Sequence, residues 1–327
     1  MNIKARAAAA AIAAGALLAM AGGAAAQSAY PDRAVKVLVG YAPGGPIDII
    51  ARIVCNRLNA IWGQPVVVEN LSGAAGNIAA ERVAKSRADG YTLLMGSNAL
   101  MVINPSLYGT AKFDPNKELI PISEAVYSPN ILVVPNTIPA KNVQELVAYL
   151  HAHPGGTFGS AGVGTTQHLA GELFKAMAHV DIQHVPYRGA APVITDLLGG
   201  RLTMFFGAVA PLLPLIKQGK VRALAVTSAK RFPAVPALPT MIEAGYPGFV
   251  SVLSIGLMAP TGTPPAIIEK IHQGTVQALA DREVRQRLAK IGMEVVANSP
   301  SEFAAALATE RPQWAKIMKD ANITVRH

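Results

Sequence analysis

The sequence predicts an α/β protein that folds as two lobes. Short runs of apolar, often β-branched residues alternate with helical patterns along most of the chain, which is typical of parallel strands joined by helices. A mature chain of about 300 residues is long enough for two cores rather than one. Proline-punctuated segments at 129–139 and 231–247 mark places where the chain could cross between lobes. We therefore expect mostly parallel sheets, flanked by helices, in each lobe.

The expected strands are short apolar runs bounded by polar, glycine or proline residues, as buried strands are. In chain order they are Val35–Val39, Val66–Glu69, Thr92–Met95, Ile131–Val134, Gln183–Val185, Leu202–Phe206, Leu224–Thr227 and Ile255–Met258. A further short strand is expected just before the glycine-rich stretch that begins at Phe158.

The expected helices carry apolar residues three and four positions apart between these strands. In chain order they are Asp48–Ile61, Asn77–Lys85, Val143–His151, Thr166–Met177, Pro192–Leu198, Leu212–Lys217, Pro265–Leu279, Asp281–Ile291 and Pro300–Lys319. The last three follow one another from about residue 264, and we expect them to return to the first lobe. On this basis residues 27–127 with 251–327 form lobe 1, and residues 128–250 form lobe 2.

Residues 1–26 have the features of a cleavable secretory signal peptide. Lys4 and Arg6 precede an apolar run of Ala, Gly, Ile, Leu and Met that ends in three alanines at 24–26. A permanent membrane anchor is the alternative, because the run approaches the roughly 20 apolar residues of a span. Alanine and glycine make a poor anchor, and no cysteine follows the run to carry a lipid. We expect a soluble mature protein in the periplasm of a Gram-negative cell.

The mature chain is moderately basic. Removing Lys4 and Arg6 lowers the count of basic residues from 29 to 27 against 20 acidic residues, so the net charge falls from +9 to +7. Such a surface can attract an anionic small molecule towards a cleft. The basic residues do not cluster with interleaved aromatic residues, so we expect no nucleic-acid partner.

The cysteine and histidine content favours neither a disulfide nor a metal site. Cys55 is the one cysteine and lies on an apolar helical pattern, where a buried small hydrophobe is the expected role. His151 and His153 form the one close histidine pair, without a cysteine or metalloprotease motif nearby. We expect no metal and no cofactor.

Two glycine-rich stretches each follow an expected strand and lead into an expected helix. The first is Tyr41-Ala42-Pro43-Gly44-Gly45, and the second spans Ser160-Ala161-Gly162-Val163-Gly164-Thr165-Thr166. Unpaired N–H groups and the positive end of the helix dipole make such helix N-termini anion sites, and glycine lets a ligand approach the backbone. One such site in each lobe would hold a carboxylate from both sides of a cleft. Ordinary turn and cap chemistry is the alternative for Ser160, Thr165 and Thr166.

Three further candidates have open alternatives. Ser97 and Asn98 follow the strand at Thr92–Met95, at an end where ligands of α/β sheets tend to lie; a simple turn is the alternative. Asp48 either orders the Pro-Gly-Gly loop or binds an amine on a ligand. His168 either contacts the ligand or is a hydrogen-bonded structural histidine.

The sequence offers little support for an enzyme. Gly159-Ser160-Ala161-Gly162 is not the Gly-x-Ser-x-Gly pattern of a nucleophile elbow. Neither glycine stretch ends as a P-loop does or gives a full dinucleotide-binding pattern. No nucleophile–base pair can be identified from the sequence.

Ordered motifs along the mature chain resemble the Bug family, the periplasmic solute-binding proteins of tripartite tricarboxylate transporters. They include Tyr41-Ala-Pro-Gly-Gly-x-x-Asp48-x-x-Ala-Arg52, Gly63-Gln-Pro-Val-Val-Val-Glu-Asn70, Ala88-Asp-Gly-Tyr-Thr-Leu-Leu94, Asn104-Pro-Ser-Leu-Tyr108, Ser160-Ala-Gly-x-Gly164, His168-Leu-Ala-Gly-Glu172, His184-Val-Pro-Tyr-Arg-Gly189, Gly219-Lys-Val-Arg-Ala-Leu-Ala-Val-Thr227 and Pro239-Thr-x-x-Glu-Ala-Gly245.

This resemblance implies a two-lobed periplasmic binding protein of the type II-like fold, with a small organic acid in the cleft. The acid would be a mono- or dicarboxylate, aromatic acids included, delivered to the permease subunits of the transporter. The ligand-binding residues that we infer from the loops and the resemblance are Tyr41, Ala42, Pro43, Gly44, Gly45, Asp48, Ser97, Asn98, Ser160, Ala161, Gly162, Gly164, Thr165, Thr166, His168, Tyr187, Gly207 and Ala208.

The chain departs from the usual family pattern where specificity would be set. Many relatives carry an acidic residue and Asn after Met-Phe, where this chain has Gly207 and Ala208 after Phe206. Many also carry Trp before Tyr-Gly-Leu, where this chain has Leu253-Ser254-Ile255-Gly256, and a basic residue at Leu71. If Gly207 and Ala208 line the distal pocket, the missing carboxylate disfavours an amino acid and permits a bulkier, more apolar acid.

Two alternatives to transport stay open from the sequence. The ligand-bound protein could signal to a membrane sensor through the same cleft, or the chain could be an exported hydrolase with Ser160 as its nucleophile.

Overall fold

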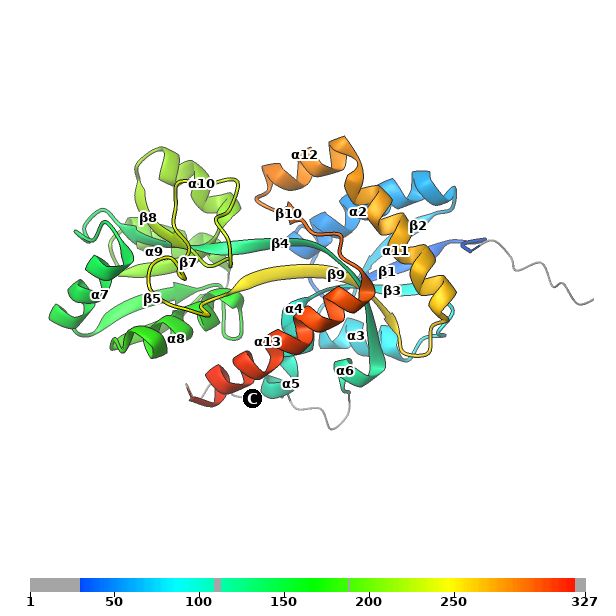
Figure 1. The fold of residues 1–327 in the computed structure, drawn as a ribbon, viewed down its shortest axis with the longest axis horizontal. Coiled ribbons are helices and arrows are strands. Elements are labelled where there is room, and N and C mark those ends of the chain that lie inside the picture. The colour runs from blue at the N-terminus through cyan, green and yellow to red at the C-terminus, as the bar shows by residue number, and fades with distance from the viewer. Residues whose placement is uncertain (1–29, 109–112, 188, 321–327) are drawn as a thin grey trace, which may run out of the picture.

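The computed structural model describes residues 30–108, 113–187 and 189–320. It shows two lobes side by side, joined by the long strand β4, which runs through both, and by the segment that leads back into β9 of the first lobe (Figure 1). The predicted signal peptide lies outside the described residues. None of the described helices is long and apolar enough to cross a membrane.

The first lobe contains the N-terminal strands and the C-terminal helices. Its N-terminal elements are β1 (Val35–Val39), α2 (Pro46–Trp62), β2 (Val66–Asn70), the 3-10 turn η2 (Ala74–Gly76), α3 (Asn77–Ala84), β3 (Thr92–Ser97), α4 (Asn98–Val102), α5 (Asn104–Tyr108) and α6 (Pro115–Glu118). Its C-terminal elements are α11 (Pro265–Ala280), α12 (Arg282–Lys290), β10 (Glu294–Val295) and α13 (Pro300–Asp320). The C-terminal helices α11 and α12 pack against α2 of the first lobe (Figure 1).

The second lobe is a continuous stretch of strands and helices. Its elements are α7 (Val143–Ala152), β5 (Gly156–Ser160), α8 (Thr166–Ala178), β6 (Ile182–Pro186), α9 (Ala190–Leu198), β7 (Met204–Ala208), α10 (Val209–Lys217) and β8 (Val221–Val226). Each strand–helix pair repeats the predicted alternation, and β5 pairs parallel with both β6 and β7.

The connecting strands are β4 (Leu119–Pro135) and β9 (Val252–Pro260). Residues Leu119–Pro129 of β4 pair antiparallel with β9, and residues Asn130–Pro135 pair with β7 and β8 of the second lobe. The sheet order is β2-β1-β3-β9-β4-β7-β5-β6, with β8 and β10 also paired to β4. The α/β class is confirmed, but only the outer strands are parallel. The strands that pass between lobes are antiparallel because the chain enters the second lobe along β4 and leaves it to return along β9.

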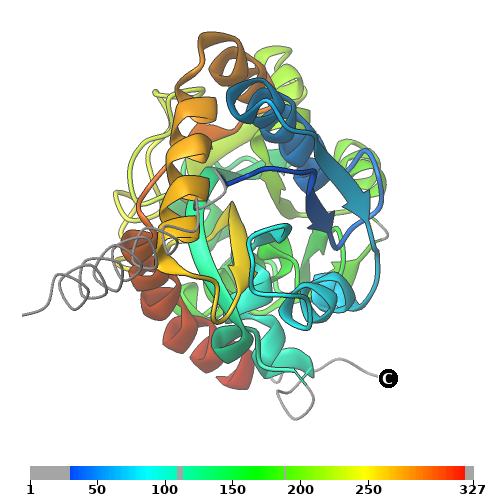
Figure 2. The ribbon, with the colours of Figure 1, turned by 90° about the vertical axis from the view of Figure 1, so that its right-hand side faces the viewer.

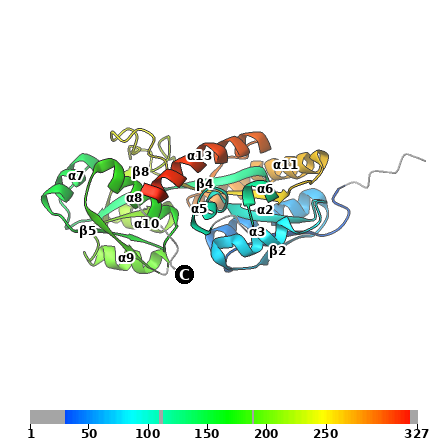
Figure 3. The ribbon, with the colours of Figure 1, turned by 90° about the horizontal axis from the view of Figure 1, so that it is seen from below.

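The burial pattern of β1 shows why the first lobe has helices on both faces of its sheet. Val35, Val37 and Val39 belong to the core that contains residues of α2 and α11, whereas Leu38 belongs to a second core that contains residues of α3 and α13. Figure 2 shows helices on both sides of the strands. Successive side chains of a strand point to opposite faces, so an apolar run without alternation needs cover on both. The core that contains Leu38 extends to residues of α7 and α8 in the second lobe. Helix α13 lies across the two lobes (Figure 3).

The predicted element types hold along the chain, with differences at the ends. The strand predicted at Ile131–Val134 is the second half of β4, whose first half contains Pro121 and Pro129 and was missed for that reason. The short helices α4, α5 and α6 and the strand β10 were also missed, because each is at most five residues long. Strand β4 changes partners between Pro129 and Asn130, and β9 begins at Val252. The lobe boundaries at 127/128 and 250/251 stay a prediction.

Candidate functional site

A cavity of about 450 Å³ lies between the lobes, and both predicted glycine loops line it. The lining residues from the first lobe and β9 are Tyr41, Ala42, Pro43, Gly45, Pro46, Ile47, Ala75, Ser97, Ala99, Asn104 and Leu253. Those from the second lobe are Ala161, Val163, Gly164, Thr165, Thr166 and Gln167. The tertiary structure thus brings together two loops that are more than a hundred residues apart in sequence.

The first wall is the N-terminus of α2. Gly45 is the N-cap residue, and no side chain caps the helix in the described structure. The first backbone bond of the helix runs from Ile49 N to Gly45 O, so the N–H groups of Ile47 and Asp48 precede the intrahelical ladder. Pro46 fills the first helical position, where its missing N–H costs nothing. The helix therefore presents uncapped donors and its positive dipole end beside the cavity.

Asp48 holds the Pro-Gly-Gly loop rather than lining the cavity. Its carboxylate accepts hydrogen bonds from Gly44 N at 2.9 Å, Asn70 Nδ2 at 2.9 Å and Arg52 Nε at 3.0 Å. The Arg52 hydrogen bond is the main cause that lowers the pKa of Asp48 to about 2. Gly44 has a φ of +82° with open space around it, a backbone conformation that favours glycine. Of the two roles predicted for Asp48, the structure shows the loop-ordering one.

The second wall is the N-terminus of α8. Thr165 is its N-cap residue, and the Thr165 hydroxyl accepts a hydrogen bond from His168 N at 3.3 Å. The ladder begins with Leu169 N donating to Thr165 O, so the N–H groups of Thr166 and Gln167 precede it. The Gln167 side chain accepts from Ala161 N at 2.8 Å and so fixes the start of the loop. This wall mirrors the first, with backbone donors at a helix N-terminus beside the same cavity.

Ser160 and His168 lie behind this wall and do not line the cavity. Ser160 has no exposed surface, and its hydroxyl contacts Gly162 N and O as well as His184 Nε2 at 2.7 Å. His168 Nδ1 accepts from Gly164 N at 3.2 Å. Sequence reasoning did not identify His184 as a partner of Ser160. The Ser–His contact belongs to a closed turn, and its hydroxyl does not face the cavity.

Tyr41 and Ser97 contribute the polar part of the first wall. The Tyr41 hydroxyl donates to Ala75 O at 3.0 Å, and burial raises its pKa. Asn104, whose amide donates to Ala75 O and Asn77 Oδ1, lies beside them. Its amide hydrogens are therefore used within the protein.

Asn98, predicted as a ligand contact, is not among the residues that line this cavity. Its side chain donates to Val252 O and to Glu310 Oε2 and accepts from Ser254 N. Asn98 therefore ties α4 to β9 and α13. Its position after a strand correctly indicated a polar role, but the turn of α4 directs the side chain into the protein.

Gly207, Ala208 and Tyr187 also lie outside the cavity lining. A side chain at Gly207 would come within 2.4 Å of Phe205 and 2.5 Å of Leu212, so the glycine makes room for core packing. Ala208 pairs with Asn130 of β4 and caps α10. The Tyr187 hydroxyl donates to Asp196 at 2.7 Å. Neither Gly207 nor Ala208 lines this cavity, and a distal pocket at these two positions stays a prediction.

The structure adds lining residues that the motifs did not indicate. Leu253 approaches from β9, Ala99 from α4, Ala75 from η2 and Val163 from the second loop. Val163 is 52% exposed, unusually high for a large apolar side chain. The exposure of Val163 depends on the tertiary structure. In the sequence, only the position of Val163 between two glycines indicates it.

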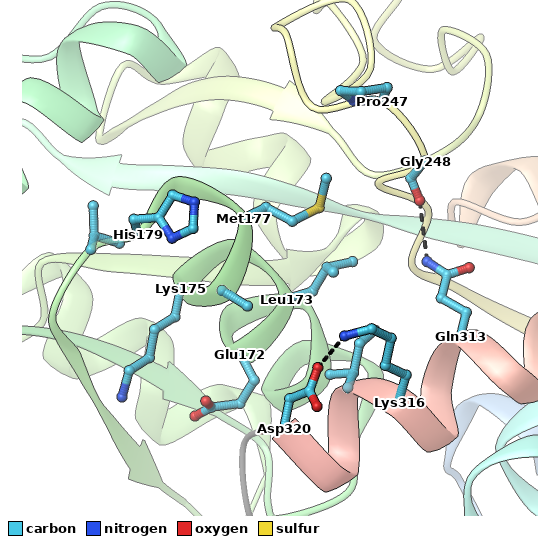
Figure 4. Close-up of a pocket in the computed structure, with 13 residues that line it drawn as sticks. Glu172, Leu173, Lys175, Met177, His179, Pro247, Gly248, Gln313, Lys316 and Asp320 are labelled. Carbon is cyan, nitrogen blue, oxygen red and sulfur yellow. Dashed lines mark hydrogen bonds and ion pairs between the residues drawn. The ribbon is translucent and has the colours of Figure 1, made fainter.

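A larger open hollow of about 1070 Å³ lies between α8 and α13 and contains none of the predicted residues (Figure 4). Its rim carries Glu172, Lys175, Lys316 and Asp320, and Lys316 pairs with Asp320. Gln313 of α13 donates to Gly248 O across one side of it. Charges of both signs make this surface a poor match for an anion. Within the described ranges, no group of three or more metal-ligating side chains occurs.

Known proteins resemble this chain across most of its length. Residues 50–323 match the family described as "Tripartite tricarboxylate transporter family receptor". Protein BugT of Bordetella pertussis (strain Tohama I) is 35% identical over 299 residues, which cover 91% of this chain and 92% of BugT. An R. palustris protein solved with adipate is 36% identical, with a TM-score of 0.78 and coverage of 90% of this chain and 100% of its own.

MatC from Rhodopseudomonas palustris, solved with bound malate, is 31% identical. Its TM-score is 0.74, and the match covers 88% of this chain and 99% of MatC. The sequence match and the shared fold agree over both lobes. The chain therefore belongs to the tripartite tricarboxylate transporter receptor family and is a periplasmic binding protein of the Bug type.

Proposed function

We propose that the protein captures a small organic carboxylate between its lobes and delivers it to the permease of a tripartite tricarboxylate transporter. The observation that carries this proposal is the meeting of two helix N-termini, one from each lobe, at one cavity. Export directed by the predicted signal peptide, followed by its cleavage, would place the mature protein in the periplasm.

The chemistry of the two walls suits a carboxylate. The donors are backbone N–H groups of α2 and α8, and both helix dipoles present their positive ends to the cavity. These groups are held in place before the ligand arrives, so little ordering is needed on binding. Ordered water can bridge donors that do not reach the ligand directly.

The remainder of the ligand would meet an uncharged surface. The lining residues in the described ranges are apolar, or carry hydroxyl or amide groups, and none is acidic or basic. An unpaired ammonium or second carboxylate buried there would lose its hydration without an ionic partner. Relatives described with adipate and malate support an organic acid. For this chain we propose an acid with an apolar body, of which aromatic acids are one group.

Thermal unfolding with a panel of acids tests the proposal. Benzoate, hexanoate, adipate, malate and citrate would each be added to ligand-free protein. At a concentration of 100 times its Kd, a bound acid raises the free energy of unfolding by about 2.7 kcal/mol. We expect at least one acid to stabilise the protein, with a matched amine, benzylamine or hexylamine, as the control. Failure of every acid, after verified removal of co-purified ligand, would contradict carboxylate binding.

Delivery to a permease needs a separate test. Deletion of the gene should abolish uptake of the radiolabelled acid, and expression of the chain should restore it. Intact uptake in the deletion strain, with an altered transcriptional response to the acid, would favour the sensing alternative.

A further inference from the structure

Two histidines lie directly behind the second wall of the cavity. His168 belongs to α8 and is 5% exposed, and His184 belongs to β6. Their rings stack with centroids 3.9 Å apart, and His184 stacks in turn on Phe158 at 5.0 Å. Phe158 is fully buried, so the stack is anchored in the core of the second lobe.

Both histidines hold the backbone of the loop that lines the cavity, His168 directly and His184 through the hydroxyl of Ser160. His184 Nε2 lies 2.7 Å from the Ser160 hydroxyl, which accepts from Gly162 N at 3.1 Å. His168 Nδ1 accepts from Gly164 N at 3.2 Å. Gly162 and Gly164 have φ values of +142° and +78°. A glycine backbone can adopt several conformations, and these hydrogen bonds hold Gly162 and Gly164 in one of them.

The hydrogen bond that His168 accepts requires a neutral ring. His168 Nδ1 must keep its lone pair to accept from Gly164 N, which places the ring proton on Nε2, 3.8 Å from Glu172. With a proton on Nε2, His184 donates to Ser160 while the Ser160 hydroxyl donates to Gly162 O, 3.0 Å away. Burial lowers the pKa of both rings, to about 3 for His168 and about 4 for His184. The network therefore keeps one protonation state near neutral pH.

We propose that His184 and His168 are positioning residues, which fix the loop from Ser160 to Thr166 so that its backbone donors meet the ligand carboxylate. This inference rests on the proposed function. Neither ring touches the cavity, and each acts through an intermediate group, Ser160 for His184 and Gly164 for His168. In a preorganised site, N–H donors that are displaced by a fraction of an ångström make much weaker hydrogen bonds to the ligand.

Calorimetric titration with the tightest-binding acid of the panel tests the pair Ser160 and His184. We expect Ser160→Ala and His184→Ala each to weaken binding by about tenfold. The double variant should lose little more than either single one, because both changes break the same chain of contacts. His184→Gln should recover most of the affinity, since its side-chain amide can donate to Ser160. Ser160→Ala removes a single oxygen and keeps the test valid if His184→Ala fails to fold.

The matched control is His153→Ala, an exposed histidine of the same lobe that stacks on Tyr149. It should leave both affinity and folding unchanged. NMR gives a readout that does not depend on the ligand. In the spectrum of the histidine ring nitrogens, His168 should show the Nε2–H tautomer. In the backbone amide spectrum, the signal of Gly164 should shift in His168→Gln.

The outcomes separate the two proposals. If wild-type protein binds an acid and the folded Ser160→Ala and His184→Ala variants bind it equally well, the positioning role is overturned. Affinity losses that multiply in the double variant, with no recovery in His184→Gln, would also overturn it. If the wild-type protein binds none of the acids, the carboxylate proposal fails, and the positioning inference fails with it.

Discussion

Asp48 is a buried charge whose partners lie on the Pro-Gly-Gly loop, on α2 and at the end of β2. Its side chain is 3% exposed and also pairs with Arg52 Nη2 at 2.9 Å. A buried carboxylate is tolerated because four donors surround it, from Gly44, Asn70 and two positions of Arg52. Through its hydrogen bond with Gly44 N, Asp48 fixes the Pro-Gly-Gly loop that forms part of the first wall.

Replacing Asp48 by Asn should destabilise the protein and weaken ligand binding. The amide would place an NH₂ group against donors that now meet a carboxylate, so we expect a loss of about 2 kcal/mol in the free energy of unfolding. Urea denaturation and calorimetric titration measure the two effects. Glu81→Gln, which breaks the exposed pair with Lys85, is the matched control and should change stability by about 0.5 kcal/mol or less. Equal effects of the two variants would contradict the role given to Asp48.

The histidine pair should make stability depend on pH. The pKa of His184 falls from 6.5 to about 4 on folding, and that of His168 from 6.5 to about 3. Below pH 6.5 the unfolded chain takes up protons that the folded chain does not, so stability is retained above pH 6.5 and decreases as pH falls towards 4. Glu310 acts in the opposite sense, because burial raises its pKa from 4.5 to about 6.

A comparison with His184→Gln isolates the histidine contribution from that of Glu310. Between roughly pH 7 and pH 5, the wild-type protein should lose about 1 to 2 kcal/mol more stability than the variant. Urea denaturation at each pH gives the two slopes. Parallel slopes would show that His184 has the same pKa in the folded and unfolded chains.

The two helices that border the cavity differ in how their N-termini are capped. α2 begins at Gly45 with Pro46 and has no side-chain cap, whereas Thr165 caps α8. Both leave backbone donors free at the cavity. The two glycines also differ. Gly45 has a φ of −75°, and an added Cβ would make only an ordinary contact, 3.5 Å from Ala42 O. Gly164 has a φ of +78°, and an added Cβ would lie 2.9 Å from Leu107. A substitution at Gly164 therefore strains the fold, and Gly45 is the cleaner probe.

Gly45→Ala should weaken binding while the fold stays intact. The added methyl group lies beside the backbone N–H groups at the start of α2 and keeps the ligand from approaching them. We therefore expect a loss of about tenfold in affinity. Calorimetric titration and the thermal midpoint measure affinity and folding. Gly199→Ala, at the C-cap of α9 with a φ of −77°, is the matched control. Unchanged affinity in Gly45→Ala would remove this glycine from the site.

At the scale of the whole molecule, β4 and β9 connect the lobes while α13 lies across both (Figure 3). An additional hydrogen bond joins the segment before β9 to the second lobe, from Ser251 Oγ to Thr166 O. Two strands between two lobes are a common arrangement for closure around a ligand. We infer that the lobes move towards each other on binding, with the bend near the change of partners in β4.

Small-angle X-ray scattering tests this movement. Saturation with the tightest acid should decrease the radius of gyration of the wild-type protein. The same acid, at the same concentration, should leave Gly45→Ala less compact because fewer molecules are occupied. An unchanged radius for the saturated wild-type protein would show that the ligand enters a cleft that is already closed.

The sequence by itself determined the α/β class, most helices and strands, and the two loops that line the cavity. These features depend on neighbouring residues: apolar spacing, glycine and proline punctuation, and capping residues such as Thr165. It also indicated Asp48, whose partners Gly44 and Arg52 lie within four residues of it.

The tertiary structure alone decided where side chains distant in sequence point. Asn98 turns towards Glu310, 212 residues away, and Gly207 makes room for Phe205 and Leu212 in the core. The Ser160–His184 contact and the place of Leu253 in the cavity likewise depend on strands brought together by sheet pairing. A motif specifies local backbone geometry, whereas the neighbours of a side chain depend on how the whole chain packs.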